Sequence, residues 1–135
     1  MSRLGLMLVE VQEFEEAIEL LEYCTSREAT NPDHFIYLGV AHQKNGQFEL
    51  AMESYKKALN LDKSNSTVYN NIGSVHLMYF LRTKDLNQYR QAVSNFNNAL
   101  AFNPYFQAAI NGKAAAEKFK LQLDKIQNQD NKYLP

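Results

Sequence analysis

The chain has 135 residues, of which 45% are apolar and 21% charged, the composition of a folded domain with a sizeable core. Its 14 Lys and Arg residues nearly balance 15 Asp and Glu residues, so it lacks the basic excess of many nucleic-acid-binding domains. The single cysteine excludes an internal disulfide, and the apolar run at residues 4–9 is too short to cross a membrane. We therefore expect a cytoplasmic protein that binds neither nucleic acid nor a membrane.

A 34-residue period runs through the sequence. It is marked by three dipeptides, Leu4-Gly5, Leu38-Gly39 and Ile72-Gly73. An aromatic residue and an alanine follow each dipeptide: Phe14 and Ala17, Phe48 and Ala51, Tyr89 and Ala92. In the third repeat these later residues come seven positions late, so seven residues have been inserted before Tyr89. A period of this length is typical of proteins built from stacked helix pairs.

The first two repeats each predict a pair of helices. Residues 1–31 form the first unit, whose first helix is shortened because Met1 takes the slot of its leading aromatic residue. Residues 32–65 form the second unit, in which apolar side chains three and four residues apart predict two helices around a turn at Asn45-Gly46. We expect Gly39, like Gly73 in the third unit, to lie where the two helices of its unit cross.

The third unit, residues 66–106, carries the insertion, which falls at residues 79–85. Seven residues are close to two helical turns, so we expect each helix of this hairpin to be about one turn longer. Tyr79, Phe80 or Leu81 should be covered, whereas the polar tip should stand clear of the neighbouring units.

The last predicted element is a capping helix over residues 107–127, followed by a flexible tail at residues 128–135. The apolar residues of this helix are Ile110, Ala114, Phe119, Leu123 and Ile126. Lys113 and Glu117 occupy slots that are apolar in the earlier units. We therefore expect a more polar outer face, as the end of a helical stack requires.

At these residues the chain resembles the tetratricopeptide repeat (TPR) family, whose repeat places Leu-Gly, alanines and aromatic residues at fixed spacing. The second unit matches at Phe35, Leu38, Gly39, His42, Ala51, Tyr55 and Ala58, and the third at Tyr69, Ile72, Gly73, His76, Ala92, Phe96, Ala99 and Pro104. The resemblance implies an all-α solenoid of stacked antiparallel helix pairs, with three TPR-like units and a capping helix. It also implies a non-catalytic scaffold or adaptor that binds a peptide or helical segment of a partner protein in its concave groove.

In the register of that family, the first helix of each unit lines the groove. The residues predicted to line it are Leu6, Val9, Ile36, Tyr37, Val40, Lys44, Asn70, Asn71, Ser74 and Leu77. Tyr37, Asn70 and Asn71 should lie at its centre, because a tyrosine offers contact area and amides can pair with a guest backbone. A solvated polar face is the alternative for the two asparagines.

One TPR subfamily holds the terminal carboxylates of chaperones with a clamp of lysine, asparagine and arginine. The matching slots here are Ser2, Leu6, Tyr37, Thr67 and Asn71, or, one unit further along, Ile36, Val40, Asn71, Ala108 and Gly112. Neither set contains the required cations, so this resemblance does not extend to that function.

No group of residues predicts catalysis. His42 and His76 occupy one slot of adjacent units, and two histidines with no carboxylate nearby make an incomplete metal site, so we expect them to pack. Cys24 takes the slot of Ala58 and Ala99 and should be buried. We expect no enzyme activity, metal or cofactor.

Two alternatives to a simple adaptor remain open from the sequence. Residues 1–31 hold seven glutamates against two arginines, a net charge of −5, while the remainder carries +4. Together with the shortened first helix and the long third hairpin, this asymmetry suits a module that self-associates, although a solvated acidic helix face explains it as well. The chain could equally be a TPR fragment of a larger protein.

Overall fold

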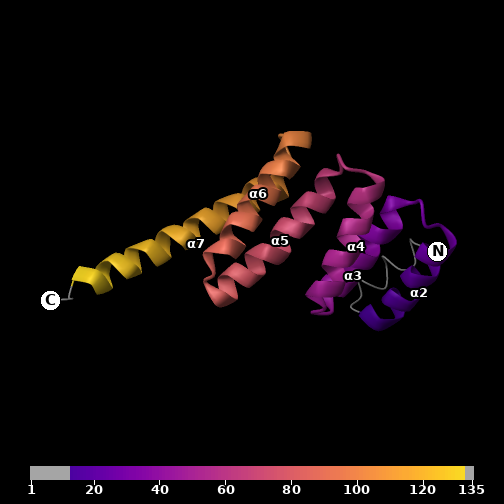
Figure 1. Cartoon of the computed structure of the whole chain (residues 1–135), viewed down its shortest axis with the longest axis horizontal. Helices are drawn as coiled ribbons and strands as arrows, with labels where there is room; N and C mark the ends of the chain where they lie inside the picture. The colour runs from indigo at the N-terminus through magenta and orange to yellow at the C-terminus, as the bar shows by residue number, and fades with distance from the viewer. Residues whose placement is uncertain (1–12, 133–135) are drawn as a thin grey trace.

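The computed structural model describes residues 13–132, and this part of the chain consists of helices joined by short loops, with no strand (Figure 1). The helices are α2 (Phe14–Arg27), α3 (Pro32–Lys44), α4 (Phe48–Leu61), α5 (Ser66–Thr83), α6 (Leu86–Phe102) and α7 (Gln107–Lys132). The predicted first helix of the first unit lies outside the described residues. The expectation of an all-α chain is confirmed.

The helices form a stack that follows the order of the chain. Figure 1 shows α2 at one end, the α3–α4 and α5–α6 hairpins in the middle, and α7 at the other end. Each helix pair packs on the next, α2 on α3, α4 on α5, and α7 on both α5 and α6. This arrangement confirms the predicted solenoid of stacked antiparallel helix pairs.

Short polar signals set the helix starts and turns. The side chains of Asn31, Asn65 and Asp85 each accept a hydrogen bond from a backbone N–H in the first turn of α3, α5 and α6, at 3.0, 3.2 and 2.9 Å. Gly46 ends the α3–α4 turn with a φ of +78°, a left-handed conformation that glycine adopts without strain. Lys84 takes a similar conformation, with a φ of 61°, at the end of α5.

The core runs along the whole stack as three linked clusters. Ala17, Leu21, Leu38 and Ala41 join α2 to α3, and a central cluster around Tyr55, Val68 and Val75 joins α3, α4 and α5. A third cluster of Ala92, Phe96, Ala99 and Ala109 joins α6 to α7. Because each cluster spans two neighbouring units, burial of apolar surface ties every unit to the next.

In the second and third units, a glycine of the first helix makes room for an aromatic ring of the second helix. A Cβ built on Gly39 would collide with the Tyr55 ring, and one built on Gly73 would lie 2.8 Å from the Phe96 ring. Both glycines therefore lie at helix crossings, as predicted. The sequence did not reveal that Gly112 of α7 has the same role: a Cβ there would lie 2.5 Å from Cζ of Phe96, so this ring lies between two glycines.

The helix lengths show where the inserted residues go. α5 and α6 have 18 and 17 residues, against 13 and 14 for α3 and α4, so both helices of the third unit are longer. Phe80, in the added part of α5, is completely buried, and its ring centroid lies 5.3 Å from that of Tyr89 and 5.1 Å from that of Phe119 in α7. The insertion therefore creates a small aromatic core that holds the last helix.

The tip of this hairpin is exposed from Arg82 to Leu86 and polar up to Asp85, as expected, but it does not stand clear of the neighbouring unit. Tyr79 packs edge-on against Phe48 of α4 and its hydroxyl donates a hydrogen bond to Glu49 at 3.3 Å. The Arg82 guanidinium lies 5.5 Å from the centre of the same Phe48 ring. The longer helix carries these side chains back over α4, which the sequence pattern alone did not indicate.

The last helix buries a different face from the one expected. Ala109 and Ala116 are completely buried against the third unit, while Ile110 is 39% exposed and Ala114 is also exposed. Of the apolar residues named for this helix, Phe119 packs on Phe80, whereas Ile110 and Ala114 face away from the third unit, where the described residues place no second helix against them. α7 also continues to Lys132, beyond the expected end at residue 127.

Candidate functional site

The least buried faces of α3 and α5 carry most of the predicted groove residues. On α3, Tyr37 and Val40 are half-buried and Lys44 is exposed, at spacings of three and four residues. On α5, Asn71 and Ser74 are half-buried in the slots 34 residues after Tyr37 and Val40. Because of the repeat, α3 and α5 carry accessible side chains in equivalent slots. We call these two rows of side chains the strips of α3 and α5.

Three side chains from different helices form a polar chain beside these strips. The Tyr55 ring passes Gly39, and its hydroxyl donates a hydrogen bond of 2.7 Å to Oε1 of Gln43 on α3. The Asn71 amide on α5 hydrogen-bonds the same hydroxyl. Burial raises the pKa of Tyr55 well above its usual value, so the hydroxyl stays protonated and donates to Gln43. A residue of the second helix therefore fixes the amides of two first helices.

Two predicted groove residues are buried instead. Ile36 is 6% exposed and belongs to the central core, and Asn70, in the same slot of the next unit, is 9% exposed. The expectation that Asn70 offers its amide to a guest therefore needs correction, because this slot faces the next unit along the stack. Its Oδ1 has no hydrogen-bond partner among the described residues, an unusual state for a buried amide.

Of the remaining predicted residues, some make contacts within the chain and others lie outside the described residues. Leu77 packs against the third core cluster, and the Ser74 hydroxyl donates a hydrogen bond to the Asn70 carbonyl. Leu6 and Val9 lie outside the described residues. Sequence reasoning missed Gln43, because no spacing in the sequence indicates that the Tyr55 hydroxyl reaches it.

The two histidines have the packing role expected of them. Nδ1 of His42 lies 2.9 Å from Oε1 of Gln47, and Nδ1 of His76 lies 2.7 Å from Oε1 of Gln88. With that amide assignment, each histidine donates its Nδ1 hydrogen to the glutamine. Among the described residues, no group of three or more His, Cys, Asp or Glu side chains is placed to hold a metal ion.

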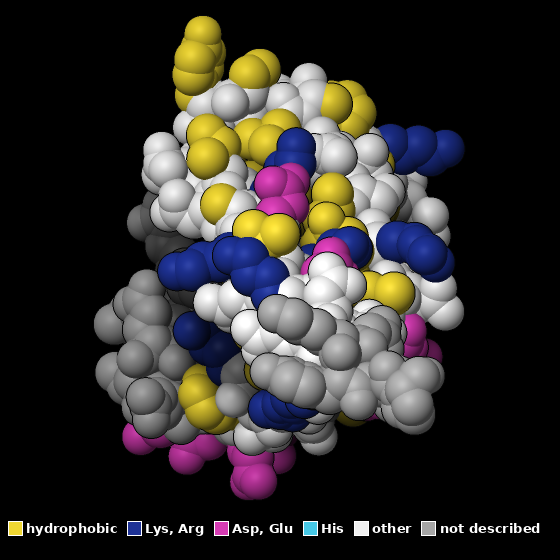
Figure 2. Space-filling view, turned by 90° about the vertical axis from the view of Figure 1, so that its left-hand side faces the viewer, with side chains coloured by type: hydrophobic (Ala, Val, Ile, Leu, Met, Phe, Trp, Pro, Cys, Tyr) yellow, Lys and Arg dark blue, Asp and Glu magenta, His cyan; other side chains and the backbone are white. Residues whose placement is uncertain are grey.

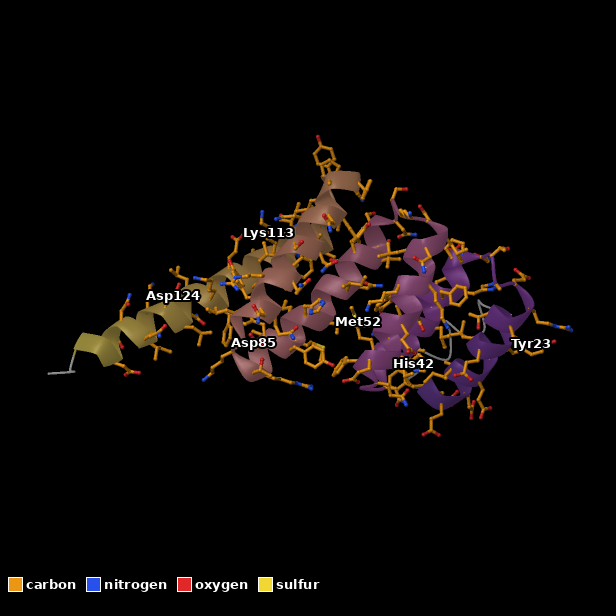
Figure 3. The ribbon with its side chains drawn as sticks, in the orientation of Figure 1. Tyr23, His42, Met52, Asp85, Lys113 and Asp124 are labelled. Carbon is orange, nitrogen blue, oxygen red and sulfur yellow. The ribbon has the colours of Figure 1, made fainter. Side chains whose placement is uncertain are left out.

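Charge and hydrophobicity are mixed on the described surface. Viewed from the end at which α7 projects, hydrophobic side chains lie between basic and acidic ones rather than forming one charged face (Figure 2). The carboxylates of α2 concentrate on its outer side, where Glu15, Glu19 and Glu22 are exposed, and Figure 3 shows Tyr23 pointing outward from the same helix. Of the described helices, none is both long enough and apolar enough to span a membrane.

Comparison with known proteins agrees with this architecture. A family model described as the TPR repeat matches residues 44–78. The Sgt2 TPR domain from Aspergillus fumigatus superposes with a TM-score of 0.77 at 18% identity, over 92% of this chain and 79% of its own. The first TPR of Spaghetti (RPAP3), bound to an HSP90 peptide, gives 0.76 at 18% identity, over 89% and 90% of the two chains.

A third similar structure is the Yersinia enterocolitica type III secretion chaperone SycD in complex with a peptide of the translocator YopD. It gives a TM-score of 0.74 at 17% identity, over 90% of each chain. A search of curated protein sequences found no match. The match to the TPR repeat thus covers α4 and most of α5, and the described chain has the fold of a TPR domain.

Proposed function

We propose that this chain is a non-catalytic adaptor that binds a peptide or helical segment of a partner protein along the accessible strips of α3 and α5. The observation that carries the proposal is the paired strip itself, in which Tyr37 and Val40 on α3 and Asn71 and Ser74 on α5 are only partly buried. Two of the similar structures hold a peptide of another protein, which supports the same use of the fold here.

The side chains of the strips indicate which guest would fit. Tyr37 and Val40 offer apolar contact area, while Asn71 and Gln43 are held in place by the Tyr55 hydroxyl. Amides that are already positioned can pair with a guest backbone at a low entropic cost. The guest is therefore a segment with apolar side chains rather than an acidic chain end, because Lys44 is the one cation among the predicted groove residues.

The proposal is tested by finding a partner in a pull-down from the host and titrating it against the wild type and Tyr37→Ala. Loss of the ring should weaken binding by about 1–2 kcal/mol without unfolding the domain. Tyr23→Ala is the matched control, because Tyr23 is an exposed tyrosine on the outer side of α2. Binding should change little with salt, because a groove with one cation has little charge for the dissolved ions to screen.

Equal affinities for Tyr37→Ala and the wild type would exclude these strips as the binding site. A steep decrease of affinity with salt, or a larger effect of Tyr23→Ala, would instead assign binding to the charged outer faces.

A further inference from the structure

Two asparagine–glycine pairs of this chain lie in different surroundings. Asn45-Gly46 forms the turn between α3 and α4, whereas Asn111-Gly112 lies inside α7. Such a pair can modify itself, because the backbone nitrogen of a residue without a Cβ can attack the side-chain carbonyl carbon of the asparagine before it. The two pairs share this chemistry, so the fold decides which of them reacts.

The surroundings of Gly46 leave room for the attack. Its φ of +78° lies outside the helical range, and a Cβ built on it would meet no atom within 4 Å. Two hydrogen bonds close the turn: Gly46 N–H donates to the Gln43 carbonyl at 3.1 Å, and Gln47 N–H donates to the His42 carbonyl at 2.8 Å. These bonds lie at the end of a helix, where local opening costs little free energy.

The second pair is held in place. Asn111 and Gly112 are the fifth and sixth residues of α7, so their backbone groups belong to the regular helical hydrogen-bond pattern. A Cβ built on Gly112 would lie 2.5 Å from Cζ of Phe96, which shows how closely this glycine packs on a buried ring. The Asn111 side chain also accepts a hydrogen bond of 2.8 Å from Gln107. Attack on Asn111 therefore requires opening of a packed helix.

We propose that Asn45 is a self-modification site, which deamidates in the folded protein through a cyclic imide with Gly46. The Gly46 nitrogen forms a bond to Cγ of Asn45, the bond from Cγ to Nδ2 breaks, and Nδ2 leaves as ammonia with the proton of the Gly46 N–H. Water then adds to one of the two imide carbonyl carbons, whose bond to the Gly46 nitrogen breaks as that nitrogen takes up a proton. Addition at Cγ gives aspartate at position 45, and addition at the main-chain carbon gives isoaspartate, in which the chain runs through Cβ and Cγ.

The new carboxylate would lie close to other negative charges. Asn45 lines a pocket between the α3–α4 turn and the start of α2, together with Glu13, Phe14, Glu15 and Glu16. A negative charge at this position is disfavoured by the three glutamates and by the dipole of α3, which ends here. Deamidation should therefore weaken the contact between the first and second units.

The same change removes a hydrogen-bond donor from the turn. The Asn45 amide donates to Oε1 of Gln47 at 3.3 Å, and this oxygen also accepts the bond from His42. A carboxylate cannot donate, so it would repel the Gln47 oxygen that the amide now holds. The strips of α3 and α5 take no part in the reaction, which can therefore be tested without a guest.

Peptide mapping by mass spectrometry, after incubation of the full chain at neutral pH, tests the proposal. Asn45 should convert at least about tenfold faster than Asn111, because a helix end opens more readily than a helix interior. Both aspartate and isoaspartate should form at position 45, since water can open either side of the imide. In concentrated urea the two sites should convert at similar rates, because the unfolded chain gives neither of them protection.

The effect on the turn is tested with Asn45→Asp, which carries the charge of the product from the start. Exchange of the Gly46 and Gln47 amide hydrogens should become about two- to fivefold faster than in the fresh wild type, and the difference should shrink at high salt. Asn45→Gln is the matched control, because it keeps an amide and would have to form a larger ring. It should neither deamidate at this position nor speed exchange.

Four outcomes would contradict the proposal. Conversion of Asn111 as fast as that of Asn45 in the folded chain, or an undiminished preference for Asn45 in urea, would show that the fold does not select the site. Aspartate without isoaspartate would exclude the cyclic imide. Unchanged amide exchange in Asn45→Asp would refute the effect on the turn.

Discussion

Replacing Gly73 by leucine tests the packing on which the stack depends. A Cβ at this position would lie 2.8 Å from two atoms of the Phe96 ring, closer than atoms pack. The ring cannot retreat, because Gly112 of α7 closes its other side and tolerates no additional atom there either. A leucine in place of glycine gains about 1 kcal/mol of helix propensity, whereas overpacking costs about 1–3 kcal/mol for a small insertion and more for a whole side chain.

We therefore expect Gly73→Leu to lower the free energy of unfolding by about 1–3 kcal/mol, measured by urea denaturation and circular dichroism. Ser74→Leu is the control, because Ser74 is the next residue of the same helix and faces the half-exposed strip, and it should change stability by about 0.5 kcal/mol or less. In a double-mutant cycle, Gly73→Leu and Phe96→Ala should cost less together than the sum of the two, by about 1 kcal/mol or more. An unchanged stability of Gly73→Leu, or strict additivity with Phe96→Ala, would refute this account of the crossing.

Three further outcomes follow from buried or strained residues. Phe80→Ala should lower the free energy of unfolding by about 3–5 kcal/mol, because the ring is completely buried between α6 and α7; a loss below 1 kcal/mol in urea denaturation would show that the inserted residues are not core. Cys24 should react with a thiol reagent only as the protein unfolds, and fast labelling of the native chain would contradict its burial. Lys84→Gly should raise stability by about 1 kcal/mol, because its left-handed backbone strains any residue with a Cβ; thermal melting measures the gain, and a lower midpoint would mean that the lysine makes a contact worth more than the strain.

Features that repeat along the chain were predictable from the sequence. Gly39 and Gly73 could be placed at helix crossings because the same small residue recurs in one slot. The burial of Cys24 followed from the alanines in its slot. In each case the same slot recurs in two or more units, so the packing required in one unit predicts the packing in the other.

Features that occur once were not predictable in this way. The buried face of α7 was not predictable, because Ile110 and Ala114 occupy slots that a second helix covers in the earlier units, and no described helix covers them here. The link between Gln43, Tyr55 and Asn71 depends on a ring that passes through the gap at Gly39, and nothing in the sequence spacing measures that reach. Asn70 occupies the slot of Ile36, and both are buried. The position in the repeat therefore determined the burial of Asn70 more than its polar side chain did.

The histidine–glutamine hydrogen bonds of the second and third units show how the α5–α6 hairpin can change length. His42 contacts a glutamine five residues later, and His76 contacts one twelve residues later, yet both contacts join the same two slots of a unit. The added residues therefore extend the α5–α6 hairpin beyond the His76–Gln88 hydrogen bond. The part of the unit on the other side of this bond keeps the geometry of the second unit. A further seven residues added at the tip should preserve the helical phase on both sides, since seven residues are close to two full turns. Additions of two or five residues would rotate one helix against the other, so the hairpin can be lengthened only in steps.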